Sequence, residues 1–411
     1  MEYVSRTFTP LTSNTLTAKA TSSGEALTFK VSKQAQNLPD QSTRKDSNYK
    51  SSCLGGSIHP DYRRAVNPIL TQLPTTDPAQ ILRYRDRHYA AELLAAAIGQ
   101  LDMFSWLNAN DGASTEAWRA HFELAARPAD VLLTLCRANG FIITDDGRHS
   151  PTPQAREYLV KDSPWNLRPY YTQIQDTLIA QDFLKVLRTG KPAHLHSSEE
   201  GSDWHASMQD EEFASDFTEL MNCRGLAFGQ KLAEAIAPHL GERSRLLDIG
   251  GGSGIYASTM VAAHPQLTAL VLERAPVDAI ARKEIEKHSL QEKIDVITAD
   301  MFDVDWPDCD VLLLSNVLHD WDFPEVRTLL EKSARALPTG GLVVIHEAFI
   351  NNDKTGPLPV AEYSALLMNV TQGKCYTPAE YGEILAESGF EVGEYQDTIA
   401  DRGFMTAVKR E

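Results

Sequence analysis

The segment LLDIGGGSGIYA carries Asp248 and then a glycine at every second position, Gly250, Gly252 and Gly254. It follows an apolar stretch typical of a strand and precedes one typical of a helix. Glycine allows a ligand to approach the backbone closely, and a helix N-terminus favours negative charge. The spacing is GxGxG, whereas a dinucleotide fingerprint would require glycine at Ile255, and a Walker lysine is absent. The turn alone identifies no ligand, but it makes the acids that follow it informative.

Acidic residues end the next two predicted strands. Glu273 ends TALVLE, where its carboxylate can accept both hydrogen bonds of a ribose diol. Asp300 closes the following strand and offers a carboxylate to an adenine amino group, while Met301 and Phe302 offer apolar side chains to the ring face. Any one of these residues could be an ordinary strand-end cap. Together with the glycine turn they describe a site for an adenosine with an amino-acid tail, which is S-adenosyl-L-methionine.

A histidine in the segment SNVLHDW is the candidate base. His319 follows the fourth predicted strand, at the carboxyl edge where open α/β sheets bind their ligands. Methylation of a hydroxyl requires removal of its proton, and an imidazole with a pKa near 6.5 can accept it at neutral pH. The alternative is a histidine that caps a turn. Of its neighbours, we expect Asp320 to cap the turn and Trp321 to pack near the cofactor.

Strands and helices must alternate to position these residues. Beyond Arg245, five apolar stretches are typical of strands and helical stretches separate them; the strands are SRLLDIG, TALVLER, KIDVITAD, CDVLLLSNV and GGLVVIHEAF. This order predicts an α/β fold, a Rossmann-like doubly wound parallel sheet, closed by an antiparallel end from GFEVGEYQDT and FMTAVKR. We assign residues 231–411 to this domain, which would bind the cofactor.

The preceding residues divide into three further segments. Residues 1–70 are rich in Ser, Thr, Asn and Lys, a composition that predicts a disordered extension. Residues 71–190 are mainly helical, with a helix and a hairpin, turning at Asp145–Gly147, in the winged-helix pattern. Residues 191–230 are predicted to form a linker and a connecting helix. Winged helices often bind DNA, but the acidic balance of the chain favours a packing or dimerisation role.

Composition excludes several classes of protein. The 411 residues include 39 Lys and Arg against 56 Asp and Glu, a net charge of −17 that opposes binding to nucleic acid or anionic lipid. No apolar run approaches the roughly 20 residues that span a bilayer, and the first residues lack a signal-peptide pattern. The five cysteines are dispersed, without a CxxC pair or metal-ligand spacing. We therefore expect a soluble cytoplasmic protein with reduced thiols and no metal.

From Asp248 to Phe390 the chain resembles the class I S-adenosylmethionine-dependent O-methyltransferases of the caffeic-acid and hydroxyindole type. The motifs DIGGGSG, LER, ADMF, LHDW, LPTGG, HE and the GK-Y-T stretch occur in family order, and LHDW followed by PTGG is the most specific part. The helical segment before them looks like the dimerisation domain of that family. The resemblance implies a homodimer that uses S-adenosyl-L-methionine, acts on a small molecule and needs no metal.

The resemblance also implies roles for individual residues. His319 matches the catalytic base, and Glu347 matches the glutamate that holds the base in its working tautomer. Ser315 occupies a cofactor-contacting position where plant members commonly have lysine. Cys375, in GKCYT, stands where the family has a second glutamate beside the base. This last departure leaves a single carboxylate to support His319.

Three further residues fall in segments that reach the ligands in the family. Met221 and Arg224 align with a helix segment that contacts cofactor or substrate, and core or surface roles are the alternative. Met368 could line the substrate cavity, because thioether side chains adapt to flat aromatic ligands, although ordinary core filling is the simpler interpretation. With Trp321, Met221 and Met368 complete the expected substrate contacts.

Three functional hypotheses follow. The first is an S-adenosylmethionine-dependent O-methyltransferase that methylates a hydroxyl of a small aromatic or polyketide-like specialised metabolite. The second is a non-methylating cyclase or pericyclase-type enzyme that uses the bound cofactor as a fixed charge, and it is motivated by Cys375. The third is a winged-helix regulator with a degenerate methyltransferase domain, for which a basic stripe would be needed and is not seen.

Overall fold

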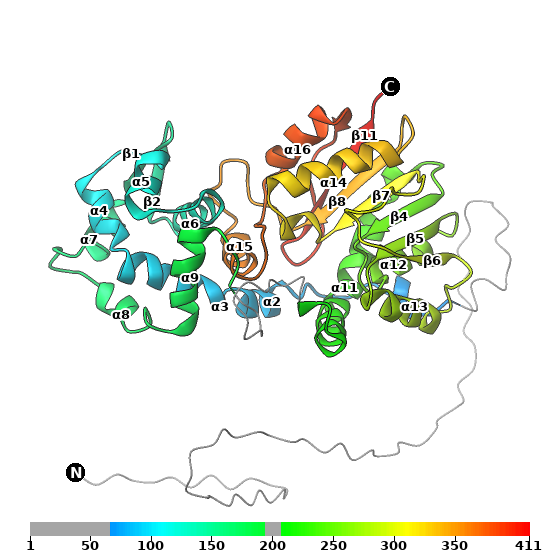
Figure 1. Ribbon diagram of the computed structural model, residues 1–411, viewed down its shortest axis with the longest axis horizontal. Coiled ribbons are helices and arrows are strands. Elements are labelled where there is room, and N and C mark those ends of the chain that lie inside the picture. Colours follow the sequence, from blue (N-terminus) through cyan, green and yellow to red (C-terminus); the bar gives the residue numbers. More distant parts are fainter. Residues whose placement is uncertain (1–65, 194–206) are drawn as a thin grey trace, which may run out of the picture. The chain divides into compact units, whose positions relative to one another are not determined.

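The computed structural model describes residues 66–193 and 207–411, all within one compact unit (Figure 1). Residues 1–65 of the predicted disordered extension (residues 1–70) and residues 194–206 of the predicted linker (residues 191–230) lie outside the described residues. The described end of the extension is ordered, because Pro68–Thr71 form the 3-10 helix η1 and Leu70 is buried. None of the described helices is long and apolar enough to span a membrane.

A large sheet carries the cofactor motifs. Its strand order is β10-β11-β8-β7-β4-β5-β6, with β9 paired to β11. Neighbours from β6 to β8 are parallel, whereas β11 is antiparallel to β8. The strands are β4 Arg245–Ile249, β5 Thr268–Glu273, β6 Ile294–Thr298, β7 Val311–Ser315, β8 Leu342–Glu347, β9 Phe390–Val392, β10 Gln396–Asp397 and β11 Gly403–Lys409. This is the predicted doubly wound sheet with its antiparallel end, and the strand order reverses between β4 and β7.

Helices cover both faces of the sheet (Figure 1). Leu246 of β4 packs in the core formed with α11, α12 and α13, while its neighbour Leu247 packs in the core formed with α14 and α16. Because side chains alternate between faces, a strand buried on both sides must be apolar throughout. The helices are α11 Glu211–Leu240, α12 Ile255–Ala263, α13 Val277–Lys287, α14 Phe323–Ala336 and α16 Pro378–Glu387.

The N-terminal part is mainly helical and contains the predicted wing. Strands β1 Ala113–Ser114, β2 Ile142–Asp145 and β3 Arg148–Pro151 form a small sheet in the order β1-β3-β2. Asp146 and Gly147 make the hairpin turn, both at positive φ, as a two-residue turn of this kind requires. The helices are η1 Pro68–Thr71, α2 Ala79–Asp86, α3 His88–Ala95, η2 Ala96–Gln100, α4 Met103–Ala109, α5 Thr115–Phe122, α6 Ala126–Ala138, α7 Pro153–Tyr158, α8 Arg168–Thr172 and α9 Leu178–Thr189.

One helix from the C-terminal part completes the core of this helical part. Helix α15, Leu358–Val370, packs against α3 and α6. Its residues Leu366, Leu367 and Met368 belong to the same buried cluster as Leu93 and Leu132. The helix lies in the sequence range predicted as the methyltransferase domain, yet its apolar side chains fill the helical core. The two parts therefore share a helix rather than a simple linker.

Four charged side chains form a network that joins α6, the loops on either side of α15 and the start of α16. Lys354 and Lys374 each contact both Asp130 and Glu380, at 2.5–2.9 Å. Burial acts to raise the pKa of Asp130 and of Glu380, but the two lysines outweigh it, and both pKa values lie below their ordinary range. The network holds the loop that carries Cys375 against the helical part.

The network predicts a pH dependence of stability. A carboxylate whose pKa is lowered on folding stabilises the protein above its unfolded pKa, and this contribution is lost as pH falls through the folded value. We expect Asp130→Asn to lower the free energy of unfolding in urea by about 1.5–3 kcal/mol at neutral pH. The difference from wild type should shrink as the pH is lowered below 4. If the difference in the free energy of unfolding between wild type and Asp130→Asn stayed constant across this range, the ionised Asp130 carboxylate would not be the stabilising group.

Candidate active site

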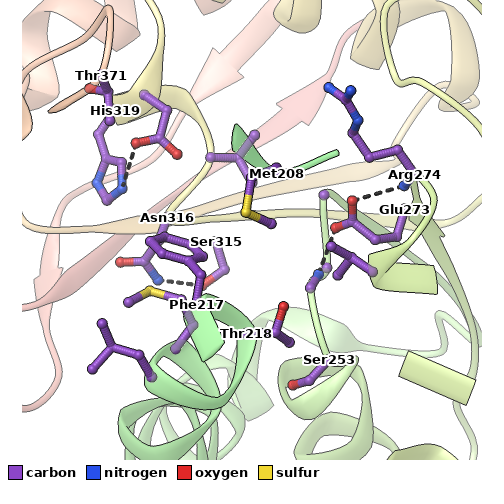
Figure 2. A pocket seen from close by; sticks show the side chains of 18 of the residues that line it. Met208, Phe217, Thr218, Ser253, Glu273, Arg274, Ser315, Asn316, His319 and Thr371 are labelled. Carbon is purple, nitrogen blue, oxygen red and sulfur yellow. Dashed lines mark hydrogen bonds and ion pairs between the residues drawn. The ribbon is translucent and has the colours of Figure 1, made fainter. Parts of the chain in front are cut away.

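A cavity of about 580 Å³ lies at the carboxyl ends of β4, β5 and β7, where the strand order reverses. Figure 2 shows Glu273 and Arg274 on one side of it and His319 on the other. Of the residues predicted for the site, eleven line this cavity: Met221, Asp248, Gly250, Gly252, Glu273, Asp300, Met301, Phe302, Ser315, His319 and Trp321. Glu347 and Met368 do not.

The glycine turn presents its backbone to the cavity. Gly250, Gly252 and Gly254 all have positive φ, between 57° and 73°, which glycine adopts without strain. A Cβ on Gly252 would meet no protein atom within 4 Å, so the space beside it is free for a ligand. The Gly252 N–H donates to Oε2 of Glu273 at 2.9 Å, and the Arg274 N–H donates to Oε1 at 2.8 Å. The turn and the predicted ribose acid are therefore held together.

Two carboxylates near the turn have raised pKa values. Burial raises the pKa of Glu273 to about 7, although the Arg274 and Gly252 N–H groups act against it. Burial likewise raises the pKa of Asp248 to about 7, against the Ala257 N–H. Oδ2 of Asp248 is buried and has no hydrogen-bond partner among the described residues. An unpaired carboxylate oxygen on the cavity wall fits a cationic amino group, such as that of S-adenosyl-L-methionine.

The adenine end of the predicted site combines one acid with apolar side chains. Oδ1 of Asp300 accepts a hydrogen bond from the Phe302 N–H at 2.9 Å, which leaves Oδ2 toward Arg274 at 4.0 Å. The Phe302 and Trp321 rings meet edge to face, with centroids 4.7 Å apart. Met301 completes this part of the wall. The Asp300 carboxylate can accept a hydrogen bond from an amino group, and the apolar side chains can contact a ring face, so this part of the wall fits adenine.

His319 lies in a short 3-10 helix, η3 Leu318–Asp320, directly beyond β7. Its side chain is buried, and its Nδ1 has no hydrogen-bond partner among the described residues. Burial lowers the pKa of His319 well below 6.5, and the nearby charges of Arg224 and Arg402 lower it further. The imidazole is therefore neutral at neutral pH and can accept a proton.

The predicted contact between Glu347 and the imidazole is wrong in this structure. Oε1 of Glu347 accepts from the backbone N–H of His319 at 3.1 Å, and Oε2 accepts from the Tyr381 hydroxyl at 2.7 Å. Glu347 is fully buried at the end of β8, beneath the turn that carries His319, so its carboxylate reaches the backbone instead of the ring. The carboxylate that approaches the ring is Asp320, whose Oδ1 lies 3.7 Å from Nε2. Asp320 was expected only to cap a turn.

Ser315 and its neighbours form a hydrogen-bonded group at the end of β7. Oγ of Ser315 contacts Nδ1 of His346 at 3.0 Å and accepts from Nδ2 of Asn316 at 3.2 Å. Asn316 also donates to the Tyr256 hydroxyl at 3.1 Å. Nε2 of His346 contacts Thr398, and His346 does not line the cavity. Ser315 lines the cavity, but its hydroxyl carries no charge, unlike the lysine that plant members of the family commonly have at this position.

Like Glu347, Met368 and Cys375 lie outside the cavity wall. Met368 is fully buried in the helical core. It therefore fills the core, and the expected contact with the substrate is not formed from this position. Cys375 is buried as well, and its N–H donates to Oγ of Ser364 at 3.0 Å. Burial raises the pKa of the Cys375 thiol, which stays neutral. Among the described residues, no group of His, Cys, Asp and Glu could hold a metal.

Several residues at the site escaped the sequence-based prediction. Tyr256, Asn316 and Tyr363 line the cavity, and Arg402 lies behind Tyr363 with its Cζ 4.4 Å from the ring centroid. Asn316 directly follows the strand that leads to the base and is held at positive φ, so its position was a usable signal. No local pattern marks the other three, because their positions depend on how distant elements pack.

The lowered pKa of His319 predicts the shape of the pH profile. If neutral His319 is the base, kcat/KM should stay constant as pH falls through 6.5, and its acid limb should lie below that value. Steady-state kinetics across this range would measure it. An acid limb at or above 6.5 would show that another group controls the reaction or that His319 is less buried in solution.

Comparison with known proteins agrees with this geometry. A family model described as an O-methyltransferase domain matches residues 181–391. A 3-hydroxy-5-methyl-1-naphthoate 3-O-methyltransferase of Streptomyces sahachiroi is 32% identical, over 73% of this chain and 86% of that protein. An L-tyrosine C(3)-methyltransferase of Streptomyces lavendulae is 27% identical, over 72% of this chain and 82% of that protein.

Solved structures agree as well. An O-methyltransferase family 2 protein of Planctomyces limnophilus, solved in complex with apigenin, has a TM-score of 0.74 and 27% identity, covering 83% of this chain and 98% of that one. The fold and the cavity define a methyltransferase domain that uses S-adenosyl-L-methionine. The chain belongs to the S-adenosylmethionine-dependent O-methyltransferase family.

Proposed function

We propose that this enzyme methylates a hydroxyl of a small aromatic or polyketide-like specialised metabolite, with His319 as the general base. The observation that carries the proposal is that His319 lines the cavity that also contains the glycine turn, and that its imidazole is buried and neutral with Nδ1 unpaired among the described residues. As the hydroxyl oxygen forms a bond to the methyl carbon, its proton passes to His319. The bound cofactor would supply the methyl carbon, and its sulfur would keep the electron pair of the carbon–sulfur bond, so that atoms and charge balance.

The cofactor-binding residues have separate tasks in this proposal. S-adenosyl-L-methionine supplies the methyl group and the leaving thioether. Glu273 would bind the ribose diol with the lone pairs that the Gly252 and Arg274 N–H groups leave free. Oδ2 of Asp248 would accept from the amino group, and Asp300 would accept from the adenine. Positioning of the two reactants supplies most of the rate enhancement.

The character of the acceptor follows from the remaining wall. Met208, Phe213, Phe217, Leu366 and Val370 give it large apolar surfaces. Such surfaces bind flat rings and exclude water from the transferred methyl group. Relatives named for a naphthoate and an apigenin complex are consistent with an aromatic acceptor.

Assembly and location belong to the same proposal. Large apolar side chains are exposed on the helical part, including Trp165, Tyr170 and Leu178, the last two 79% exposed. We propose that this surface joins two chains in a homodimer, because large exposed apolar residues mark interaction surfaces. The four cysteines of the described part are free thiols, and this favours the cytoplasm.

Release of S-adenosylhomocysteine from labelled S-adenosylmethionine tests the proposal. Across a panel of phenols and aromatic polyketides, methyl transfer should give equal amounts of S-adenosylhomocysteine and methylated product. The non-methylating alternative, which Cys375 motivated, predicts tight cofactor binding and isomerised acceptor without S-adenosylhomocysteine. That result would overturn the proposed function.

A further inference from the structure

Arg224 places a cation on the cavity wall without a carboxylate partner. It lies on α11 and lines the cavity, and its Nη2 is 3.0 Å from Sδ of Met221. It also shares a hydrogen bond with Tyr363 of α15. No carboxylate among the described residues forms an ion pair with it within 4.0 Å, whereas Arg85, another arginine of the wall, contacts Asp86 at 3.0 Å. The guanidinium therefore has donors available to a ligand.

A second arginine strengthens the positive charge behind this wall. Arg402 is 3% exposed, and its Nε and Nη2 have no hydrogen-bond partner among the described residues. Its Cζ lies 4.4 Å from the centre of the Tyr363 ring. Tyr363 is also the residue that forms a hydrogen bond with Arg224. Both arginines act on the pKa of His319 and lower it. The region around the base therefore carries positive charge from two arginines.

The acids near the base do not balance these two cations. Burial raises the pKa of Asp320 well above its usual range, and Glu347 raises it further, although Arg224 acts in the opposite direction. Burial raises the pKa of Glu347 to about 7. Asp86, on α2, faces Arg224 at longer range and is already bonded to Arg85. The neutral groups facing Arg224 are the hydroxyls of Tyr256 and Tyr363. A sulfonium would add a further positive charge to this region.

We propose that Arg224 binds a carboxylate of the acceptor, so that the preferred acceptor is a hydroxylated aromatic acid. A carboxylate supplies two acceptor oxygens that match the planar guanidinium fork, and burial strengthens the pair. Arg224 and His319 both line this cavity, so a carboxylate bound by Arg224 would fix which hydroxyl of the ring faces the base. The proposal rests on the proposed function for the identity of the reaction, but binding of the acid does not require turnover.

Binding of a naphthoic acid and of its neutral amide to the S-adenosylhomocysteine-loaded enzyme tests the proposal. Titration calorimetry should show the acid binding at least about 10-fold more tightly than the amide, and Arg224→Met should remove this preference, a loss of about 10- to 100-fold for the acid. Arg224→Lys should retain part of it, because it keeps the charge but not the fork. Arg245→Met is the matched control, since Arg245 pairs with Asp310 at the opposite end of β4.

Two results would overturn the proposal. One is equal binding of acid and amide by wild type. The other is equal weakening of both ligands by Arg224→Met. If circular dichroism shows that Arg224→Met is unfolded, the comparison of wild type with Arg224→Lys decides. Retained acid preference without any S-adenosylhomocysteine release would instead refute the proposed function and leave the acid-binding role of Arg224 intact.

Discussion

Replacement of His319 by alanine is expected to slow methyl transfer by about 100- to 10,000-fold, the usual contribution of a positioned general base. The reason is that no other imidazole among the described residues lines the cavity. The nearest carboxylate is that of Asp320, whose Oδ1 lies 3.7 Å from Nε2 and whose pKa burial raises well above its ordinary value. Single-turnover measurement of methylated product would isolate this step from product release. S-adenosylhomocysteine affinity should remain unchanged, because His319 is not among the residues proposed to hold the cofactor.

His121→Ala is a suitable control for this experiment. His121 is exposed on α5 and packs against Trp106 in the helical part, so its loss should leave turnover near that of wild type. Should His319→Ala retain most of the wild-type rate on an acceptor with a phenolic pKa above 9, the acceptor must lose its proton to another group. An acceptor that is already ionised in solution would depend less on His319, and a series of phenols of graded pKa would reveal this trend.

Replacement of Glu273 by alanine is expected to weaken cofactor binding by about 100-fold or more. Two hydrogen bonds from a ribose diol to a carboxylate would be lost, each of the charged kind that contributes about 1.5–3 kcal/mol. The Gly252 and Arg274 N–H groups would lose their acceptor as well, which loosens the turn. Titration with S-adenosylhomocysteine measures the effect directly, without reference to any acceptor.

Glu273→Gln and Asp295→Ala complete this experiment. The glutamine retains the shape and one acceptor oxygen and should give an intermediate loss. Asp295 is an exposed carboxylate on the neighbouring strand β6, and its removal should not alter cofactor affinity. Equal affinities of wild type and Glu273→Ala would show that the ribose is held elsewhere.

The doubly wound sheet and the cofactor side of the site could be predicted from sequence because their signals are local. Apolar runs predict the strands. Glu273 ends its strand, and Gly252 and Asp300 come within three residues of the end of theirs, so chain order places them at one edge of the sheet. His319 obeys the same rule after β7. Residues positioned by the end of their own strand need no knowledge of distant contacts.

The remaining features depend on packing between distant segments. The sequence correctly placed Glu347 at the end of a strand. Whether its carboxylate reaches the ring or the backbone of His319 depends on how the turn that carries His319 packs against that strand. A methionine can line a cavity or fill a core, and sequence alone does not distinguish the two roles for Met368. The packing of α15 in the helical core shows that Met368 fills the core. The approach of Arg402 to Tyr363 joins the residue that precedes β11 to a residue of α15, and no sequence periodicity connects the two.

The shared helix α15 restricts how such a chain can be recombined with its relatives. Its inner face fills the helical core, while Tyr363, Leu366 and Leu367 also line the active-site cavity. A chimera with its crossover between residues 190 and 231 would combine the helical part of one parent with the α15 of the other, and the mismatched core would be strained or hollow. A second crossover that transfers residues 348–375 with the helical part would keep that core intact. Exchange of acceptor specificity among relatives should therefore succeed only when these two separate stretches of sequence are inherited together.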